Sequence, residues 1–101
     1  MKNYNSKFKN FKDRVYEVVK RISEGETMTY KMVAKLASSP RAWRAVGNVL
    51  NKNKNPQISC HRVVRSDGKI GGYRDGLQKK AYLLQKEGVI IKNGRVINKS
   101  L

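Results

Sequence analysis

The only cysteine and the only histidine of the sequence are neighbours, Cys60 and His61. A thiol attacks as the thiolate, and its pKa of about 8.5 falls when cationic or imidazole groups lie close by. Arg62 and Arg65 follow the pair, so the surroundings of the thiol are electropositive. This pattern indicates a cysteine nucleophile served by an imidazole base.

Proximity in sequence does not by itself bring the imidazole to the thiol. Adjacent residues of an extended strand point to opposite faces, so His61 reaches Cys60 directly only if the backbone bends; otherwise it acts through a water molecule. We expect the water relay. A base also needs a carboxylate on its far nitrogen, and of the seven acidic residues we expect Glu87 to supply it. The alternative is an inert, buried cysteine, a common fate of unpaired thiols.

Length and charge limit the kinds of protein that this sequence can form. Its 101 residues fit one domain, which we place over residues 1–101. Lys and Arg number 23 against seven Asp and Glu, a net charge of +16 that favours a polyanionic partner, most commonly nucleic acid. One Cys and one His exclude an internal disulfide and a histidine-rich metal site. No segment has the length of a signal peptide or membrane span, so we expect a cytoplasmic protein.

Two helices precede the cysteine in the first third of the chain. Apolar residues at helical spacing predict a first helix from Phe8 that ends near Gly25. Thr27 or Thr29 then caps a second helix that runs to Ala37. The apolar positions of the first helix are Phe8, Phe11, Val15, Val18, Val19 and Ile22.

A third helix is predicted from Pro40 to about Asn51, with Ser39 as its N-cap. Its apolar face carries Ala42, Ala45, Val46, Val49 and Leu50. Its polar and basic face carries Arg41, Trp43, Arg44, Asn48 and Lys52. Together with the second helix it has the pattern of a helix-turn-helix, or of two helices that merely pack; the charge favours the DNA-binding interpretation.

Beyond the cysteine the pattern changes to turns, one helix and a hairpin. Residues 66–68 predict a turn, and the glycine-rich residues 69–73 predict either a pocket wall or a flexible loop. A helix from about Leu77 to Lys86 follows, and Gly88 terminates it. Leu77, Ala81 and Leu84 are expected to face inward. Residues 89–97 predict a β-hairpin with a type I′ turn at Asn93-Gly94. The fold class is mostly α with a small β component.

Four motifs together resemble one family. SCHRV at residues 59–63 is preceded by TYKMVAKLA and RAWRAVGNVLNKN and followed by SDGKIGGYRDGLQKKAYLLQKEG. Over about residues 8–88 this order resembles the DNA-binding, active-site domain of the O6-alkylguanine-DNA alkyltransferases, also called methylated-DNA–protein-cysteine methyltransferases. The signature of that family reads PCHRV. The resemblance implies a winged helix-turn-helix-like fold, with residues 89–101 as a tail that carries the hairpin.

The resemblance implies a reaction and the residues that carry it out. Cys60 matches the residue that takes an alkyl group from O6 of guanine, in one irreversible displacement, without cofactor or metal. His61 matches the water-mediated base, Glu87 the carboxylate that orients it, and Asn53 a hinge between the helix-turn-helix and the active-site loop.

The resemblance also implies a DNA-binding surface and a guanine pocket. Arg44 matches the arginine that fills the space left by a flipped nucleotide, and Tyr30 the tyrosine that pushes on the adjacent phosphate. Tyr73 matches the tyrosine that binds the purine, and the Val63 carbonyl an acceptor for the guanine amino group. The expected DNA-binding residues are Tyr30, Arg41, Ala42, Arg44, Ala45 and Arg62. The expected substrate-binding residues are Ser59, Val63, Tyr73 and Arg74.

Three departures from the family pattern bear on these expectations. Ser59 stands where the family has proline, which frees φ and restores an N–H. The segment from Gly47 to Cys60 is one residue shorter than in longer members, which bears on the match of Asn53. The amino-terminal domain of many members has no counterpart here. At Asp75, where the family varies, we expect a loop that favours methyl over benzyl-sized groups.

The expected partner is double-stranded DNA containing O6-alkylguanine, bound by a monomer that repairs it by direct reversal. One alternative is a non-enzymatic, alkyltransferase-like protein that binds the lesion; such proteins typically carry tryptophan at the nucleophile position, where this sequence has Cys60. Another is a plain winged-helix DNA binder.

Overall fold

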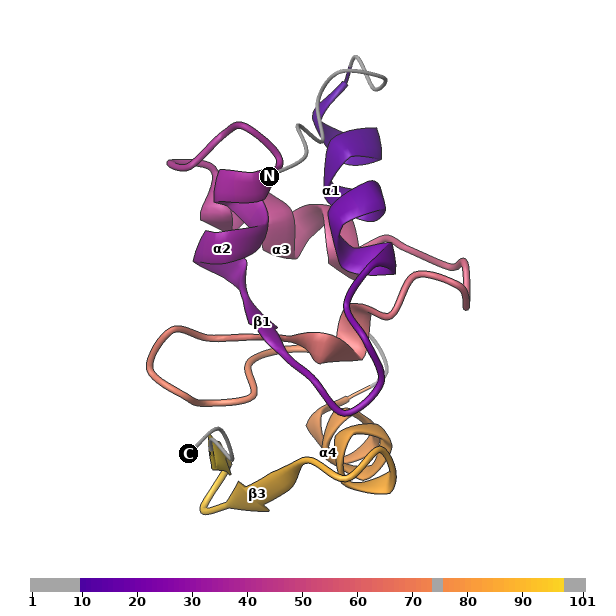
Figure 1. Cartoon of the computed structure of the whole chain (residues 1–101), viewed down its shortest axis with the longest axis vertical. Coiled ribbons are helices and arrows are strands. Elements are labelled where there is room, and N and C mark those ends of the chain that lie inside the picture. The colour runs from indigo at the N-terminus through magenta and orange to yellow at the C-terminus, as the bar shows by residue number, and fades with distance from the viewer. Residues whose placement is uncertain (1–9, 74–75, 98–101) are drawn as a thin grey trace.

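The computed structural model describes residues 10–73 and 76–97, which fold into two groups of elements. Helices α1, α2 and α3 gather at one end, and α4 with the hairpin β3–β4 forms the other (Figure 1). The strand β1 and the segment around residues 60–70 connect the two groups (Figure 1). The mostly α fold with a small β component is therefore confirmed. No helix in the described ranges has the length and apolar character to cross a membrane.

Helix α1, Phe11–Lys20, is shorter than the sequence predicts. Asn10 caps it by accepting a hydrogen bond from the backbone N–H of Asp13 at 2.8 Å. The helix ends at Lys20, with Arg21 as its C-cap, rather than near Gly25, because the backbone N–H groups of Arg21 and Ile22 bond three residues back and tighten the last turn. Ile22 is nevertheless buried as predicted, since the chain turns back toward the core.

Helix α2, Tyr30–Leu36, begins where the sequence predicts. Of the two candidate caps the structure uses Thr29, whose hydroxyl oxygen accepts a hydrogen bond from the N–H of Met32 at 3.1 Å. The helix carries no acidic residue in its first turn, so the Thr29 hydroxyl is the side chain that compensates its N-terminus.

Helix α3, Trp43–Asn51, begins three residues later than predicted. Ser38 adopts a positive φ of 65°, and the N–H of Ala42 bonds to the carbonyl of Ser39 in a separate turn. The prediction of Ser39 as an N-cap is therefore wrong. Its hydroxyl instead accepts a hydrogen bond from Arg14 at 3.3 Å, which ties the turn to α1.

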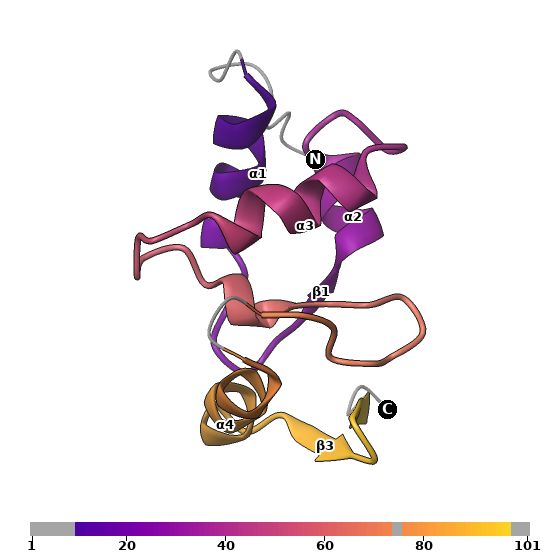
Figure 2. The same cartoon turned by 180° about the vertical axis from the view of Figure 1, so that it is seen from behind.

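The two faces of α3 are divided as the sequence predicts. Val46 and Leu50 are buried, and Ala42, Ala45 and Val49 are half-buried. The exposed positions on the other side are Arg41, Trp43, Arg44, Asn48 and Lys52. Helix α3 packs against both α2 and α1 and is seen between them in the reverse view (Figure 2).

A short parallel pair joins the two groups of elements. Strand β1, Met28–Thr29, pairs with β2, Val63–Val64, directly after the 3-10 turn η1, Cys60–Arg62. Because neighbouring strand residues point to opposite faces, Val63 enters the core of α1–α3 while Val64 enters a second core with Ile70, Leu84 and Val89. Strand β2 is thus the boundary that both cores share.

The elements after the cysteine match their predicted bounds. Helix α4 is Leu77–Lys86, β3 is Ile90–Lys92 and β4 is Arg95–Ile97. Asn93 and Gly94 have φ values of 53° and 75°, as a type I′ turn requires. The inward position expected of Leu77 is wrong: its side chain is 54% exposed, because it begins the helix at the edge of a surface cavity.

Replacing Thr29 tests the cap of α2. We expect Thr29→Ala to lower the free energy of unfolding by about 1 kcal/mol, because the N–H of Met32 loses its acceptor. Urea unfolding followed by circular dichroism measures the change. Thr29→Ser keeps the hydroxyl and is the matched control; equal losses in both variants would show that the cap contributes nothing.

Candidate functional site

Cys60 lies at a bend of the backbone rather than in an extended strand. Its N–H bonds to the carbonyl of Ile58 at 2.8 Å, and Ser59 between them has φ −81° and ψ 64°, an inverse γ-turn. The φ of Ser59 is close to the value that proline imposes, so serine here keeps the backbone direction that a proline would give. Cys60 then starts η1 with its side chain half-buried.

Asn53 connects the end of α3 to the thiol. Its Nδ2 donates to Sγ of Cys60 at 3.1 Å and to the carbonyl of Asn55 at 3.1 Å, and its Oδ1 accepts from the N–H of Asn55 at 3.0 Å. The residue is only 5% exposed, so these bonds form in a shielded environment. The geometry fits the bracing position expected of Asn53 despite the shorter loop.

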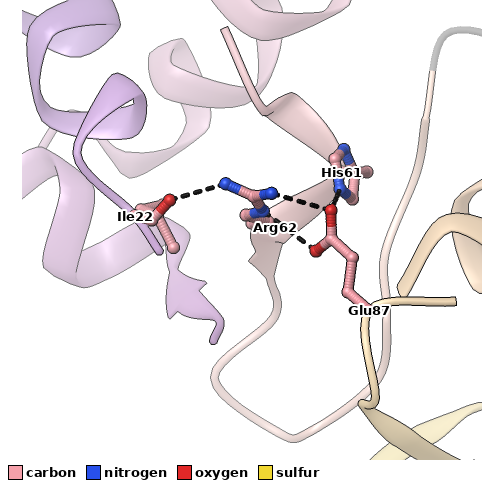
Figure 3. Close-up of polar contacts among 4 residues, drawn as sticks. All are labelled: Ile22, His61, Arg62 and Glu87. Carbon is pink, nitrogen blue, oxygen red and sulfur yellow. Dashed lines mark hydrogen bonds and ion pairs between the residues drawn. The ribbon is translucent and has the colours of Figure 1, made fainter. Parts of the chain in front are cut away.

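His61 and Glu87 form the pair that the sequence predicts. Nε2 of His61 lies 2.9 Å from Oε2 of Glu87, which is the C-cap residue of α4 (Figure 3). Because an ionised carboxylate only accepts, Nε2 carries the proton, and in the neutral ring Nδ1 is the acceptor. The imidazole is thereby fixed in one tautomer that can accept a proton at Nδ1.

Arg62 occupies the other side of the same carboxylate. Its Nε and one terminal nitrogen donate to Glu87 at 2.9 and 2.7 Å, and its other terminal nitrogen donates to the carbonyl of Ile22 at 2.7 Å (Figure 3). The side chain is 14% exposed. All three nitrogens of its guanidinium are bound inside the protein, so a contact of Arg62 with DNA would have to replace one of these bonds.

The carboxylate of Glu87 is held strongly in its charged form. Burial alone would raise its pKa, but the hydrogen bonds from Arg62 and His61 outweigh that effect and lower the pKa to about 2. The hydrogen bond with Glu87 also raises the pKa of Arg62. At neutral pH the pair of Glu87 and Arg62 is fully ionised, and His61 bonds to a permanent anion.

Lys80 is a site residue that the sequence does not predict. It is fully buried in α4, and its Nζ donates to the carbonyls of Val63 at 2.7 Å and Gly72 at 3.0 Å and contacts the Tyr30 hydroxyl at 3.4 Å. Position 80 lies four residues before the buried Leu84, on the same face of the helix, but a lysine at such a position is usually exposed.

Burial lowers the pKa of Lys80 to about 8, while a Cys60 thiolate acts in the opposite direction. Electrostatic coupling is reciprocal, so the protonated amine favours the thiolate form of Cys60. The same bonds limit Val63: its carbonyl, expected to accept from a guanine amino group, already accepts from Lys80. Lys80 also links strand β2, through Val63, to the glycine-rich loop, through Gly72.

A cavity of about 830 Å³ opens between α3, the glycine-rich loop and α4. Tyr30 and Arg44 line it, and so do residues 69–72, so of the two predicted alternatives for the glycine-rich segment the pocket wall agrees with the structure. Gly71 has a φ of 76°, and an added Cβ would lie 3.3 Å from the Tyr30 ring. Among the described residues that line the cavity, Cys60 is not one. Tyr30, which does line it, packs against the same hydrophobic core as Cys60.

The remaining predicted residues are placed as follows. The Tyr30 hydroxyl lies 3.4 Å from the carbonyl of Gly72, so a contact with phosphate would have to replace this internal bond. Burial raises the pKa of Tyr30, and a Cys60 thiolate raises it further. Tyr73 is half-buried, and its carbonyl accepts from the N–H of Gly76. Arg74 and Asp75 lie outside the described residues.

The surface around α2 and α3 is basic. Between Glu26 and Asp67 the sequence has no acidic residue. The exposed cations of this stretch are Lys31, Lys35, Arg41, Arg44, Lys52, Lys54 and Arg65. The described residues contain no group of three or more metal-binding side chains of the His, Cys, Asp or Glu type. The arrangement provides a thiol, a fixed base and a cationic approach to both.

Comparison with known proteins gives one consistent family. Residues 10–89 match the family described as 6-O-methylguanine DNA methyltransferase, DNA binding domain. A methylated-DNA–protein-cysteine methyltransferase of Methanosarcina barkeri is 47% identical over 81 residues, which cover 77% of this chain and 50% of that protein. The chain thus spans about half the length of this relative.

Solved structures with the same fold include complexes with DNA. The crystal structure of Mycobacterium tuberculosis OGT in complex with DNA superimposes with a TM-score of 0.74 at 37% identity, covering 77% of this chain and 48% of that one. S. pombe Atl1 in complex with damaged DNA containing O6-carboxymethylguanine has a TM-score of 0.74 at 29% identity, covering 81% and 79%.

Replacing Glu87 tests the carboxylate that His61 and Arg62 share. We expect Glu87→Gln to lower the free energy of unfolding at pH 7 by about 1–3 kcal/mol, because an amide accepts weaker hydrogen bonds and leaves Arg62 without its counter-charge. The folded pKa near 2 lies below the usual 4.5, so the carboxylate stabilises the fold above pH 4.5. That contribution is lost as the pH falls from 4.5 toward 2.

Urea unfolding of both proteins at pH 7 and between pH 4.5 and 2 measures the difference, which should narrow over the acidic range. Glu17→Gln is the matched control, since it removes an ion pair to the exposed Arg21 and should cost about 0–1 kcal/mol. A wild-type advantage that stays constant down to pH 2 would contradict the assigned role of Glu87.

Proposed function

Because the chain belongs to the family of O6-methylguanine-DNA methyltransferases, we propose that it repairs DNA by transferring a methyl or small alkyl group from O6 of guanine to Cys60. The observation that carries this proposal is the surroundings of the thiol. Asn53 donates to Sγ at 3.1 Å, while the next residue, His61, is fixed by Glu87. A lone structural cysteine needs neither of these partners.

The reaction is a single displacement. Nδ1 of His61 takes the proton of the Cys60 thiol through a water molecule, and protonated Lys80 favours the resulting thiolate. The sulfur attacks the alkyl carbon; the S–C bond forms as the C–O6 bond breaks, and the electron pair of that bond stays on the purine. Guanine then takes up a proton, in which we assign a part to Tyr73. Cys60 remains as a thioether, so each molecule reacts once and needs no cofactor.

The substrate atom determines how DNA must bind. O6 of guanine lies at the pairing edge inside the duplex, so the nucleotide has to leave the stack at a cost of about a few kcal/mol. Arg44, exposed on α3, is the side chain that we assign to the gap. A cavity of about 830 Å³ lies beside it, with Tyr30, Gly71 and Gly72 in its walls. Cys60 does not line this cavity, so the flipped base has to reach the thiol beyond it.

The rest of the interface binds phosphate and approaches the groove. We assign Arg41 to the DNA backbone and the half-buried Ala42 and Ala45 to close approach of α3. Ser59, Val63 and Arg74 remain assigned to the guanine site. This binding requires no base sequence and weakens with salt, which suits a monomer that searches duplex DNA for one lesion.

A second candidate function is binding of damaged DNA without transfer. The likeness to Atl1 over 79% of that chain supports this alternative. Cys60 argues against it, because a binding protein has no need of a thiol braced by Asn53. A product assay separates the two.

Mass spectrometry of the protein after reaction tests the transfer. Incubation with duplex DNA containing O6-methylguanine should add the mass of one methylene to the peptide that contains Cys60, in equimolar amount with the lesion consumed. Unmodified duplex should add nothing. Cys60→Ser should bind the lesion-bearing duplex and leave it unrepaired. An unchanged Cys60 peptide at saturating DNA would overturn the transfer and leave lesion binding as the function.

A further inference from the structure

The single tryptophan of the sequence is exposed on the basic face of the molecule. Trp43 is the first residue of α3, next to Arg44, and its side chain is 38% exposed. The buried apolar residues of the same helix, Val46 and Leu50, point to the core instead. Core packing therefore does not account for an indole at this position.

Two cations hold the indole ring in place. The guanidinium carbon of Arg44 lies 5.0 Å from the ring centroid, and Nζ of Lys31 lies 5.9 Å from it. Lys31 belongs to α2, so Trp43 is in contact with both helices of the helix-turn-helix. These cation–π contacts orient the partly exposed ring before any partner arrives.

Trp43 also separates two hollows of the surface. It lines the cavity of about 830 Å³ together with Arg44 and Tyr30. It equally lines a smaller cavity of about 240 Å³ together with Lys31 and Arg65. A ring at this position therefore lies between the two cavities, on the surface that α2 and α3 share.

The chemistry of the rim between the two cavities selects a nucleobase. Its neighbours Lys31, Arg44 and Arg65 are cations. Asp67 also lines the smaller cavity, but it is paired with Arg65 at 2.7 Å, so Lys31 and Arg44 keep the rim cationic. A cationic rim repels basic partners and attracts polyanions. Among polyanions, nucleic acids combine phosphate with flat rings, and every base offers a π-face to an aromatic side chain.

We propose that Trp43 stacks on a base of the bound DNA at the rim of the cavity, an inference that rests on the proposed function. The contact is uncharged and independent of sequence. It adds to affinity without releasing counterions, whereas Lys31 and its basic neighbours act on phosphate. Trp43 therefore contributes a part of the DNA affinity that salt does not weaken.

Binding titrations in the Cys60→Ser background test this proposal, because no transfer then obscures the equilibrium. The probe is duplex DNA with one O6-methylguanine, titrated at several salt concentrations. Trp43→Ala should weaken binding by about 5- to 150-fold with an unchanged slope of log affinity against log salt. Lys31→Ala should instead reduce that slope by about one. Tyr82→Ala, which removes a 60% exposed aromatic of α4, is the matched control and should change neither.

Two further replacements separate stacking from apolar bulk. Trp43→Phe keeps a ring and should retain most of the affinity, while Trp43→Leu keeps apolar volume without a π-face and should bind as weakly as Trp43→Ala. Equal binding by the leucine and phenylalanine variants would overturn stacking. Thermal unfolding of each variant shows whether it is folded. If Trp43→Ala does not fold, the comparison of Trp43→Phe with Trp43→Leu still tests whether the ring stacks.

The fluorescence of Trp43 gives a direct readout, since it is the only tryptophan. We expect quenching that follows the binding curve; emission that stays unchanged at saturating DNA would contradict the contact. If the wild-type chain neither binds nor demethylates the lesion, the proposed function fails and the inference fails with it. If the wild type transfers methyl and Trp43→Ala binds equally well, only the inference about Trp43 fails.

Discussion

The carboxylate of Glu87 joins three parts of the chain that are far apart in sequence. It ends α4, it accepts hydrogen bonds from His61 and Arg62 of η1, and through Arg62 it reaches the carbonyl of Ile22 after α1. Each partner depends on the others. Without Glu87 the guanidinium of Arg62 would be a buried charge with no counter-ion, and without Arg62 the low pKa of Glu87 would lose its strongest support.

This cluster lies beside the boundary between the two cores. Val63 and Val64 face opposite sides, so β2 belongs to both, and Lys80 binds the carbonyl of Val63 from the α4 side. The thiol of Cys60 stands directly before that strand. Asn53 reaches it from the end of α3. The positions of the Cys60 thiol and the His61 ring are therefore set jointly by α3, through Asn53, and by α4, through Glu87.

Local patterns predicted the elements well, whereas burial decided which polar residues belong to the site. The bounds of α4 and the Asn93-Gly94 turn follow from short-range rules. The start of α3 does not, because Ser38 adopts a positive φ that a serine rarely takes. The family resemblance placed Arg62 among the DNA-binding residues.

Only the folded chain shows that the nearest anion to Arg62 is Glu87, 25 residues away. Lys80 could not be predicted because a lysine is normally exposed to solvent. In the structure it is buried, and its partners are backbone carbonyls, which no pattern of side chains reveals. The pairing of His61 with Glu87 could be expected because the sequence has few carboxylates.

The small number of carboxylates also shapes the charge of the surface. Where carboxylates are described in ion pairs, as in Glu17 with Arg21, Asp67 with Arg65 and Glu87 with Arg62, they lie outside the stretch from α2 to η1 or at its ends. The stretch of sequence that carries Arg44 has no anion of its own, and among the described ion pairs none involves Arg44, so this part of the surface favours phosphate.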